Sequence, residues 1–140
     1  MESRERVIFP MQPRVRRRVA EYRFERFLGA ENVEIGEPLG YFEFPDVVGK
    51  ARIVVTNSGG VQKEAYFMGK PCVTLREATE WIETVEDGWN TPAGANKEED
   101  LGALNSFKPK GEPDLSIFGK VVLLKDRFHY REMACSRLYL

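Results

Sequence analysis

Three small residues, Ser58, Gly59 and Gly60, stand between an apolar run at 53–55 and a segment, 61–68, in which apolar residues recur at helical spacing. This pattern predicts that Ser58 caps a helix whose first residues are the two glycines. The free N–H groups of a first helical turn bind anions, and glycines let a phosphate approach the backbone closely. The stretch therefore predicts a phosphate site, although an ordinary capped turn has the same composition.

Glu64 lies one turn beyond Gly60 and flanks the apolar stripe of the predicted helix. Its carboxylate is therefore neither needed for packing nor plainly turned to solvent. A carboxylate beside a phosphate-binding turn suits the vicinal hydroxyls of a ribose. Together with the glycine turn, Glu64 predicts a site for a nucleoside diphosphate.

Two arginines each follow a predicted strand, Arg14 after residues 6–10 and Arg76 after residues 71–75. Because α/β folds bind ligands at the carboxyl ends of their strands, both are candidate anion contacts. Arg76 suits a bidentate contact with phosphate, but it suits an ion pair with Glu80 or Glu83 equally well.

The elements that position these residues alternate along the chain. Strands are expected at 6–10, 33–36, 53–55 and 71–75, with an edge strand at 90–94, and helical patterns stand between or after them. This order predicts an α/β fold with a Rossmann-like, three-layer parallel sheet. The helix after residue 14 is strongly basic, and we expect Val15, Val19, Tyr22 and Phe27 to turn inward from it.

The composition limits the classes of function. A chain of 140 residues fits one domain, and 21 basic residues nearly balance 22 acidic ones, so nucleic acid and membrane surfaces are not expected partners. The two cysteines form neither a disulfide framework nor a metal site, and no metal or cofactor is expected. The sequence has no long apolar run and no signal-peptide pattern, which predicts a cytoplasmic protein.

Three stretches together resemble a known family: 56–65 (TNSGGVQKEA), 69–76 (GKPCVTLR) and 79–85 (TEWIETV). They resemble the non-hydrolysing UDP-N-acetylglucosamine 2-epimerases, and most closely the subgroup with Thr-Glu-Trp rather than Thr-Glu-Arg-Pro after the arginine. The Thr-Glu-Trp sequence also favours this family over glycosyltransferases of similar architecture. The resemblance extends from about residue 7 to about residue 120.

The resemblance implies that residues 1–120 are part of the UDP-binding, C-terminal half of a two-domain GT-B fold, and that residues 121–140 form a divergent tail. It implies that Ser58, Gly59 and Gly60 hold the diphosphate, Glu64 the ribose and Phe44 the uracil. From composition alone, Phe44 is as well suited to the core as to a ligand wall.

Several family features have no counterpart here. Gln12 stands where the family has a histidine, and the residues thought to handle the proton at carbon 2, together with a central strand, precede the matched region. We therefore expect a truncated chain that binds UDP or a UDP-N-acetyl-hexosamine and has no catalytic residue. The alternative is the C-terminal subunit of a split epimerase, completed by a separate N-terminal half or by a homo-oligomer.

Overall fold

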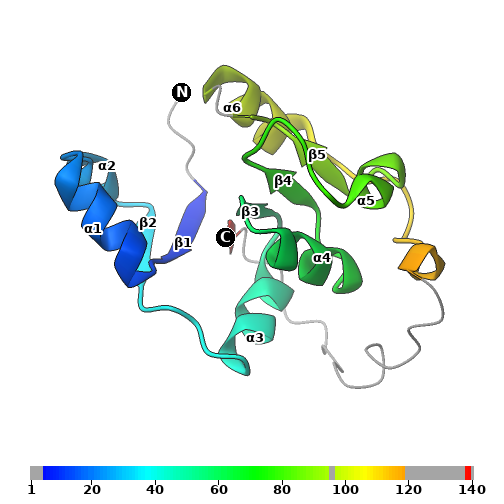
Figure 1. Ribbon diagram of the computed structural model, residues 1–140, viewed down its shortest axis with the longest axis horizontal. Coiled ribbons are helices and arrows are strands. Elements are labelled where there is room, and N and C mark those ends of the chain that lie inside the picture. The colour runs from blue at the N-terminus through cyan, green and yellow to red at the C-terminus, as the bar shows by residue number, and fades with distance from the viewer. Residues whose placement is uncertain (1–4, 95–96, 119–137, 140) are drawn as a thin grey trace.

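The computed structural model describes residues 5–94, 97–118 and 138–139 (Figure 1). The strands are β1 (Arg6–Pro10), β2 (Val33–Gly36), β3 (Val54–Thr56), β4 (Cys72–Thr74), β5 (Asn90–Pro92) and β6 (Leu138–Tyr139). The helices are α1 (Pro13–Glu21), α2 (Glu25–Leu28), α3 (Glu43–Lys50), α4 (Gly59–Phe67), α5 (Ile82–Glu86) and α6 (Lys97–Ser106), and a short 3-10 helix, η1, spans Leu115–Phe118.

The strands form two parallel sheets of three strands each, in the orders β2-β1-β6 and β3-β4-β5. In the second sheet Val54 lies opposite Cys72, and Cys72 lies opposite Asn90. The α/β class with parallel strands is confirmed, and β5 is an edge strand as predicted. The described strands do not form one continuous sheet, because β1 and β3 are not hydrogen-bonded neighbours.

Helices cover both faces of the sheet β3-β4-β5. On one face, Val48 of α3 and Ala65 of α4 pack with Val54 and Cys72. On the other face, residues of α6 pack against a cluster of Ile53, Val73 and Ala93. The result is a three-layer arrangement around the sheet that carries the glycine turn.

Strand β1 joins this core without pairing with β3. Its residue Ile8 packs against the cluster beside α3 and α4, and its neighbour Val7 packs against the cluster beside α6. Successive side chains of a strand point to opposite faces. Strand β1 therefore lies in the same layer as β3 and shares both of its apolar faces.

The helix that carries the candidate site begins and ends as the sequence predicts. Helix α4 starts at Gly59, with Ser58 as the preceding extended residue. Gly69 follows the helix in the left-handed conformation, at φ 63°, and Pro71 prevents continuation. The chain then enters β4, so the turn and the helix are fixed between two buried strands.

The expectation that Tyr22 and Phe27 turn inward is wrong. Their side chains are 55% and 58% exposed, and α1 buries no residue. The aromatic rings instead lie against Phe24 and against arginines, with the Arg26 guanidinium 4.7 Å from the centre of the Phe27 ring. Cation–π contacts with the basic face therefore replace core packing for these rings.

The predicted tail, residues 121–140, lies outside the described residues except for β6. That strand pairs with β1 in parallel, with Leu138 opposite Arg6 and Tyr139 opposite Val7. Across the described part of the chain, every helix is too short or too polar to cross a bilayer.

Candidate functional site

The N-terminus of α4 is accessible. Ser58 is exposed, its N–H donates to Thr56 Oγ1 over 3.0 Å, and its hydroxyl makes no capping bond to the helix. Gly60 is also exposed, and a Cβ added there would meet only Ser58 Oγ, at 3.9 Å. The hydroxyl and the first turn are therefore open to a ligand.

Gly59 differs from Gly60, because its missing side chain is replaced by Glu80. A Cβ built on Gly59 would lie 1.9 Å from Glu80 Oε1. The Trp81 indole N–H donates to the Gly59 carbonyl oxygen over 2.7 Å. The segment that contains Glu80 and Trp81 therefore closes one side of the glycine turn, and only a glycine at position 59 permits this contact.

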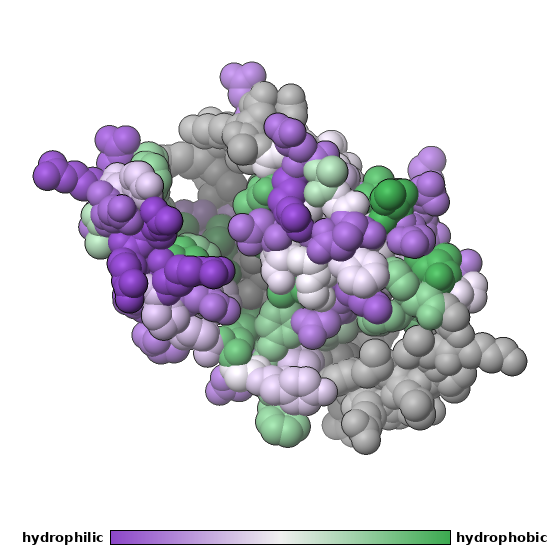
Figure 2. Space-filling model, in the orientation of Figure 1, coloured by the Kyte–Doolittle hydropathy of each residue, from purple (hydrophilic) through white to green (hydrophobic). Residues whose placement is uncertain are grey.

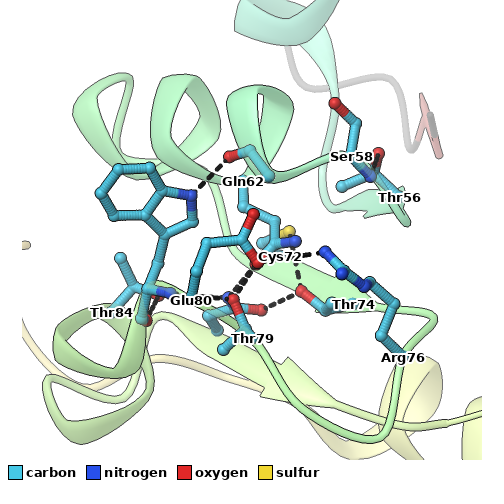
Figure 3. Close-up of polar contacts among 12 residues, drawn as sticks. Thr56, Ser58, Gln62, Cys72, Thr74, Arg76, Thr79, Glu80 and Thr84 are labelled. Atoms are coloured by element: carbon cyan, nitrogen blue, oxygen red, sulfur yellow. Dashed lines mark hydrogen bonds and ion pairs between the residues drawn. The ribbon is translucent and has the colours of Figure 1, made fainter.

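Arg76 forms an ion pair in the described structure. Its Nη1 lies 3.0 Å from Glu80 Oε2, and Figure 3 shows the two side chains pointing toward each other beside the glycine turn. Both side chains are about half exposed, at 46% and 50%. Of the roles that the sequence left open for Arg76, the structure shows the pair with Glu80. Pairs of this kind contribute little to stability, about 0–1 kcal/mol, so an anion can compete for the guanidinium.

A buried polar network holds the loop after β4 against α4 (Figure 3). Gln62 Oε1 accepts hydrogen bonds from the Thr79 hydroxyl and from Asn90 Nδ2, at 2.5 and 3.1 Å. Asn90 Nδ2 also donates to Thr84 Oγ1, and Asn90 Oδ1 accepts from the Thr74 hydroxyl over 2.7 Å. The sequence analysis missed this network, because its five members come from four elements, α4, β4, α5 and β5, and from the loop after β4.

A pocket of about 690 Å³ opens on the other side of α4. Its walls include both Phe44 and Glu64, together with Tyr41, Met68, Trp89 and Pro113. Phe44 lines the pocket and packs against the core as well, and its contact with uracil stays a prediction. A volume between about 300 and 1,000 Å³ is typical of small-molecule sites.

Glu64 stands at the boundary between this pocket and solvent. Its residue is exposed overall, but burial of the carboxyl against the pocket wall raises its pKa above the ordinary value. Gly60 lies four residues earlier on the same helix, which corresponds to about 6 Å along the axis. Helix α4 thus carries an exposed N-terminal turn and, one turn later, a carboxylate at the mouth of a pocket.

Arg14 is not brought to this site by any described contact. It is exposed in the first turn of α1, which follows β1 in the other sheet. Among the described residues it forms no hydrogen bond or ion pair with Arg76, Glu64 or the glycine turn.

The thiol of Cys72 has a structural role. Cys72 is buried in β4, and burial raises the pKa of its thiol to about 12, so it is unreactive at neutral pH. The described residues contain no group of three histidine, cysteine or acidic side chains that would hold a metal ion.

Comparison with known proteins identifies relatives of the chain. The family model for UDP-N-acetylglucosamine 2-epimerase matches residues 1–116. A protein of Methanococcus maripaludis described as a UDP-N-acetylglucosamine 2-epimerase homolog is 46% identical over 121 residues, which cover 86% of this chain and 34% of the relative. The UDP-2,3-diacetamido-2,3-dideoxy-D-glucuronate 2-epimerase of Pseudomonas aeruginosa is 42% identical over 92 residues, which cover 66% of this chain and 25% of the relative.

A solved structure also superposes on the described fold. The Methanocaldococcus jannaschii UDP-GlcNAc 2-epimerase, crystallised in complex with UDP-GlcNAc and UDP, superposes with a TM-score of 0.72 at 38% identity, over 76% of this chain and 30% of that one. The chain thus spans between about a quarter and a third of the length of these relatives and corresponds to part of their GT-B fold. It belongs to the UDP-N-acetylglucosamine 2-epimerase family.

Proposed function

We propose that this chain forms the UDP-binding half of a UDP-N-acetylglucosamine 2-epimerase active site and has no proton-transfer residues of its own. One observation carries the proposal: Glu64 joins the pocket to the exposed glycine turn along a single helix. A related enzyme crystallised with UDP-GlcNAc and UDP gives the ligand class. The same proposal places the protein in the cytoplasm, with a nucleotide sugar as its small-molecule partner.

Each part of UDP has a matching group. Uracil would lie in the pocket against Phe44, and the ribose hydroxyls would bond to Glu64 at the pocket mouth. The diphosphate would accept hydrogen bonds from the Ser58 hydroxyl and the first-turn N–H groups of α4. Arg76 would add a positive charge once it leaves Glu80.

The reaction of the family gives this half-site a defined task. A base removes the proton at carbon 2, UDP leaves with the electrons of the bond to carbon 1, and a double bond forms between the two carbons. A proton then returns to carbon 2 from the opposite face while UDP adds back to carbon 1, which inverts the configuration at carbon 2. The α4 turn would stabilise the negative charge that develops on the departing diphosphate. The base would come from residues outside the site described here.

A second arrangement supplies those residues from another polypeptide. Since the chain covers only 34% and 31% of the length of two relatives, a separately encoded N-terminal half would complete the site. A homo-oligomer would need to supply the missing groups from a second copy. Mixing this chain with the N-terminal half of a relative, and measuring epimerisation with each half as its own control, separates these arrangements.

Titration calorimetry with UDP tests the binding proposal. Ser58→Ala should weaken binding by about 1.5–3 kcal/mol, the loss of one charge-assisted hydrogen bond. Gly60→Val should weaken it more, because a β-branched side chain would stand where the phosphate approaches. Gly29→Val is the matched control, since Gly29 is exposed like Gly60 and an added Cβ there would have nothing within 4 Å. Undiminished UDP binding by Gly60→Val would exclude the turn from the site.

An activity assay tests the absence of proton transfer. General acid–base catalysis contributes about 10²–10⁴-fold, so the chain alone should not convert UDP-N-acetylglucosamine to its manno epimer at an enzyme-like rate. Conversion by the purified chain would show that it contains a functional base.

A further inference from the structure

We propose that Trp81 is a positioning residue for the diphosphate: its indole N–H fixes the Gly59–Gly60 peptide so that the Gly60 N–H faces the ligand. This inference rests on the proposed diphosphate site. It assigns a role to a residue that does not line the pocket.

The hydrogen bond itself fixes a peptide plane. Trp81 Nε1 donates to the Gly59 carbonyl oxygen over 2.7 Å. In a trans peptide this oxygen and the N–H of Gly60 lie in one plane and point in opposite directions. Both glycines lie in the first turn of α4, whose N–H groups have no partner within the helix, and the bond from Trp81 adds a further constraint on this peptide. Anchoring the carbonyl therefore orients the donor that the ligand would meet.

Trp81 is held firmly enough to serve as this anchor. Its backbone N–H donates to Thr79 Oγ1 over 3.1 Å, and its carbonyl accepts from the Thr84 hydroxyl over 2.7 Å. The Lys63 ammonium lies 4.6 Å from a centre of the indole, and the Phe118 ring packs edge-on at 5.7 Å. Lys63 of α4 and Phe118 of η1 therefore hold the ring, while the bonds to Thr79 and Thr84 hold the Trp81 backbone.

The same bond makes the ligand-facing donor stronger. A hydrogen bond to a carbonyl polarises its peptide, which makes the N–H on the other side a better donor. Gly60 is exposed, whereas Glu80 covers the neighbouring Gly59. The polarised peptide thus presents its donor on the side of the turn that a diphosphate would reach.

The test measures how variants of the full chain bind UDP, pyrophosphate and uridine. Trp81→Phe keeps an aromatic ring for Lys63 and Phe118 but removes the N–H. Affinity for UDP and for pyrophosphate should each fall about three- to tenfold, the size of one hydrogen bond, while affinity for uridine stays unchanged. Tyr66→Phe is the matched control, because it removes a different hydrogen bond of α4, to Asp87 at 2.6 Å, away from the turn.

Amide spectroscopy distinguishes positioning from packing. In the ligand-free Trp81→Phe variant the Gly60 amide resonance should move, and in Tyr66→Phe it should not. In the unmodified protein, pyrophosphate should move the Trp81 indole N–H resonance, which keeps the proposal testable if the phenylalanine variant does not fold.

The outcomes separate the two proposals. If the unmodified chain binds neither UDP nor pyrophosphate, the proposed function fails. If it binds both and Trp81→Phe binds pyrophosphate with the same affinity, or loses uridine equally, the role of Trp81 is overturned while the diphosphate site stands.

Discussion

Glu64 is the residue at which the two halves of the proposed ligand meet, and its charge affects them in opposite ways. Glu64→Gln should weaken UDP, because a carboxylate bonds vicinal hydroxyls better than an amide does. It should leave pyrophosphate affinity unchanged or slightly higher, because a negative charge near the anion is removed. Calorimetry with both ligands checks this, and equal losses for UDP and pyrophosphate would refute the ribose assignment.

The pKa of Glu64 adds a pH signature to the same variant. Because burial raises this pKa, protonation of the carboxyl begins at a higher pH than for an ordinary glutamate. As the pH falls, UDP affinity should therefore decline earlier in the unmodified protein than in Glu64→Gln. Protonation of UDP itself affects both proteins equally, so the difference between them reports the protonation of Glu64.

Glu80 competes with the ligand for two features of the site, the guanidinium of Arg76 and the space beside Gly59. Glu80→Gln removes a negative charge next to the anion and frees Arg76, so UDP and pyrophosphate should each bind about fivefold more tightly, or ~1 kcal/mol. Glu83→Gln, an exposed residue of α5, is the control for net charge. A loss of affinity in Glu80→Gln would show instead that Glu80 holds Arg76 in its binding position.

At the scale of elements, the Asn90 side chain joins β5 to α4, to α5 and to the neighbouring strand β4. Asn90→Leu leaves the buried hydroxyls of Thr74 and Thr84 and the Gln62 amide with fewer partners. Buried groups left without partners cost about 1–3 kcal/mol each, so the free energy of unfolding should fall by at least about 2 kcal/mol. Urea denaturation measures this.

The neighbouring residue provides the control for Asn90. Thr91→Val changes a half-buried residue of the same strand to an apolar one of similar shape. It should change the free energy of unfolding by less than about 0.5 kcal/mol. Similar losses in the two variants would show that packing at β5, rather than the polar network, is what matters.

Elements were predicted well wherever a local signal fixed them. The limits of β1 and β2 and the start of α4 follow from apolar runs, glycines and prolines, which act on neighbouring residues. The prediction that Tyr22 is buried was wrong, because helical spacing shows which side chains share a face but not whether another element covers that face. The contact between Glu80 and Gly59 was missed for a related reason, since the path of a loop is set by a network from distant segments.

At the scale of the whole molecule, the tail is joined to the described fold by β6, through two residue pairs with β1. Deleting residues 121–140 removes this short ladder. We expect the free energy of unfolding to change by less than about 2 kcal/mol, because so short an edge strand contributes little. Denaturation of the full and shortened chains measures the difference, and a larger loss would show that the tail is a packing element of this fold.

Figure 2 shows hydrophilic residues gathered over the part of the molecule that contains α1, and hydrophilic and hydrophobic residues side by side over the rest of this face. Since β1 packs into both apolar clusters of the other sheet, the two sheets should unfold together. A single transition observed by both circular dichroism and fluorescence is the expected result, and it allows the stability changes above to be compared directly.

The fluorescence in that experiment has an unusual source. Both tryptophans of the chain lie at the candidate site, Trp81 against the glycine turn and Trp89 in the pocket wall, where it is 8% exposed. Emission from an indole depends on its local field and hydration. The protein therefore carries two built-in fluorescent reporters, one beside the proposed diphosphate site and one in the proposed base pocket. Replacing either tryptophan by phenylalanine leaves one indole. A shift in its emission wavelength on addition of a ligand then shows whether the diphosphate or the base lies beside it.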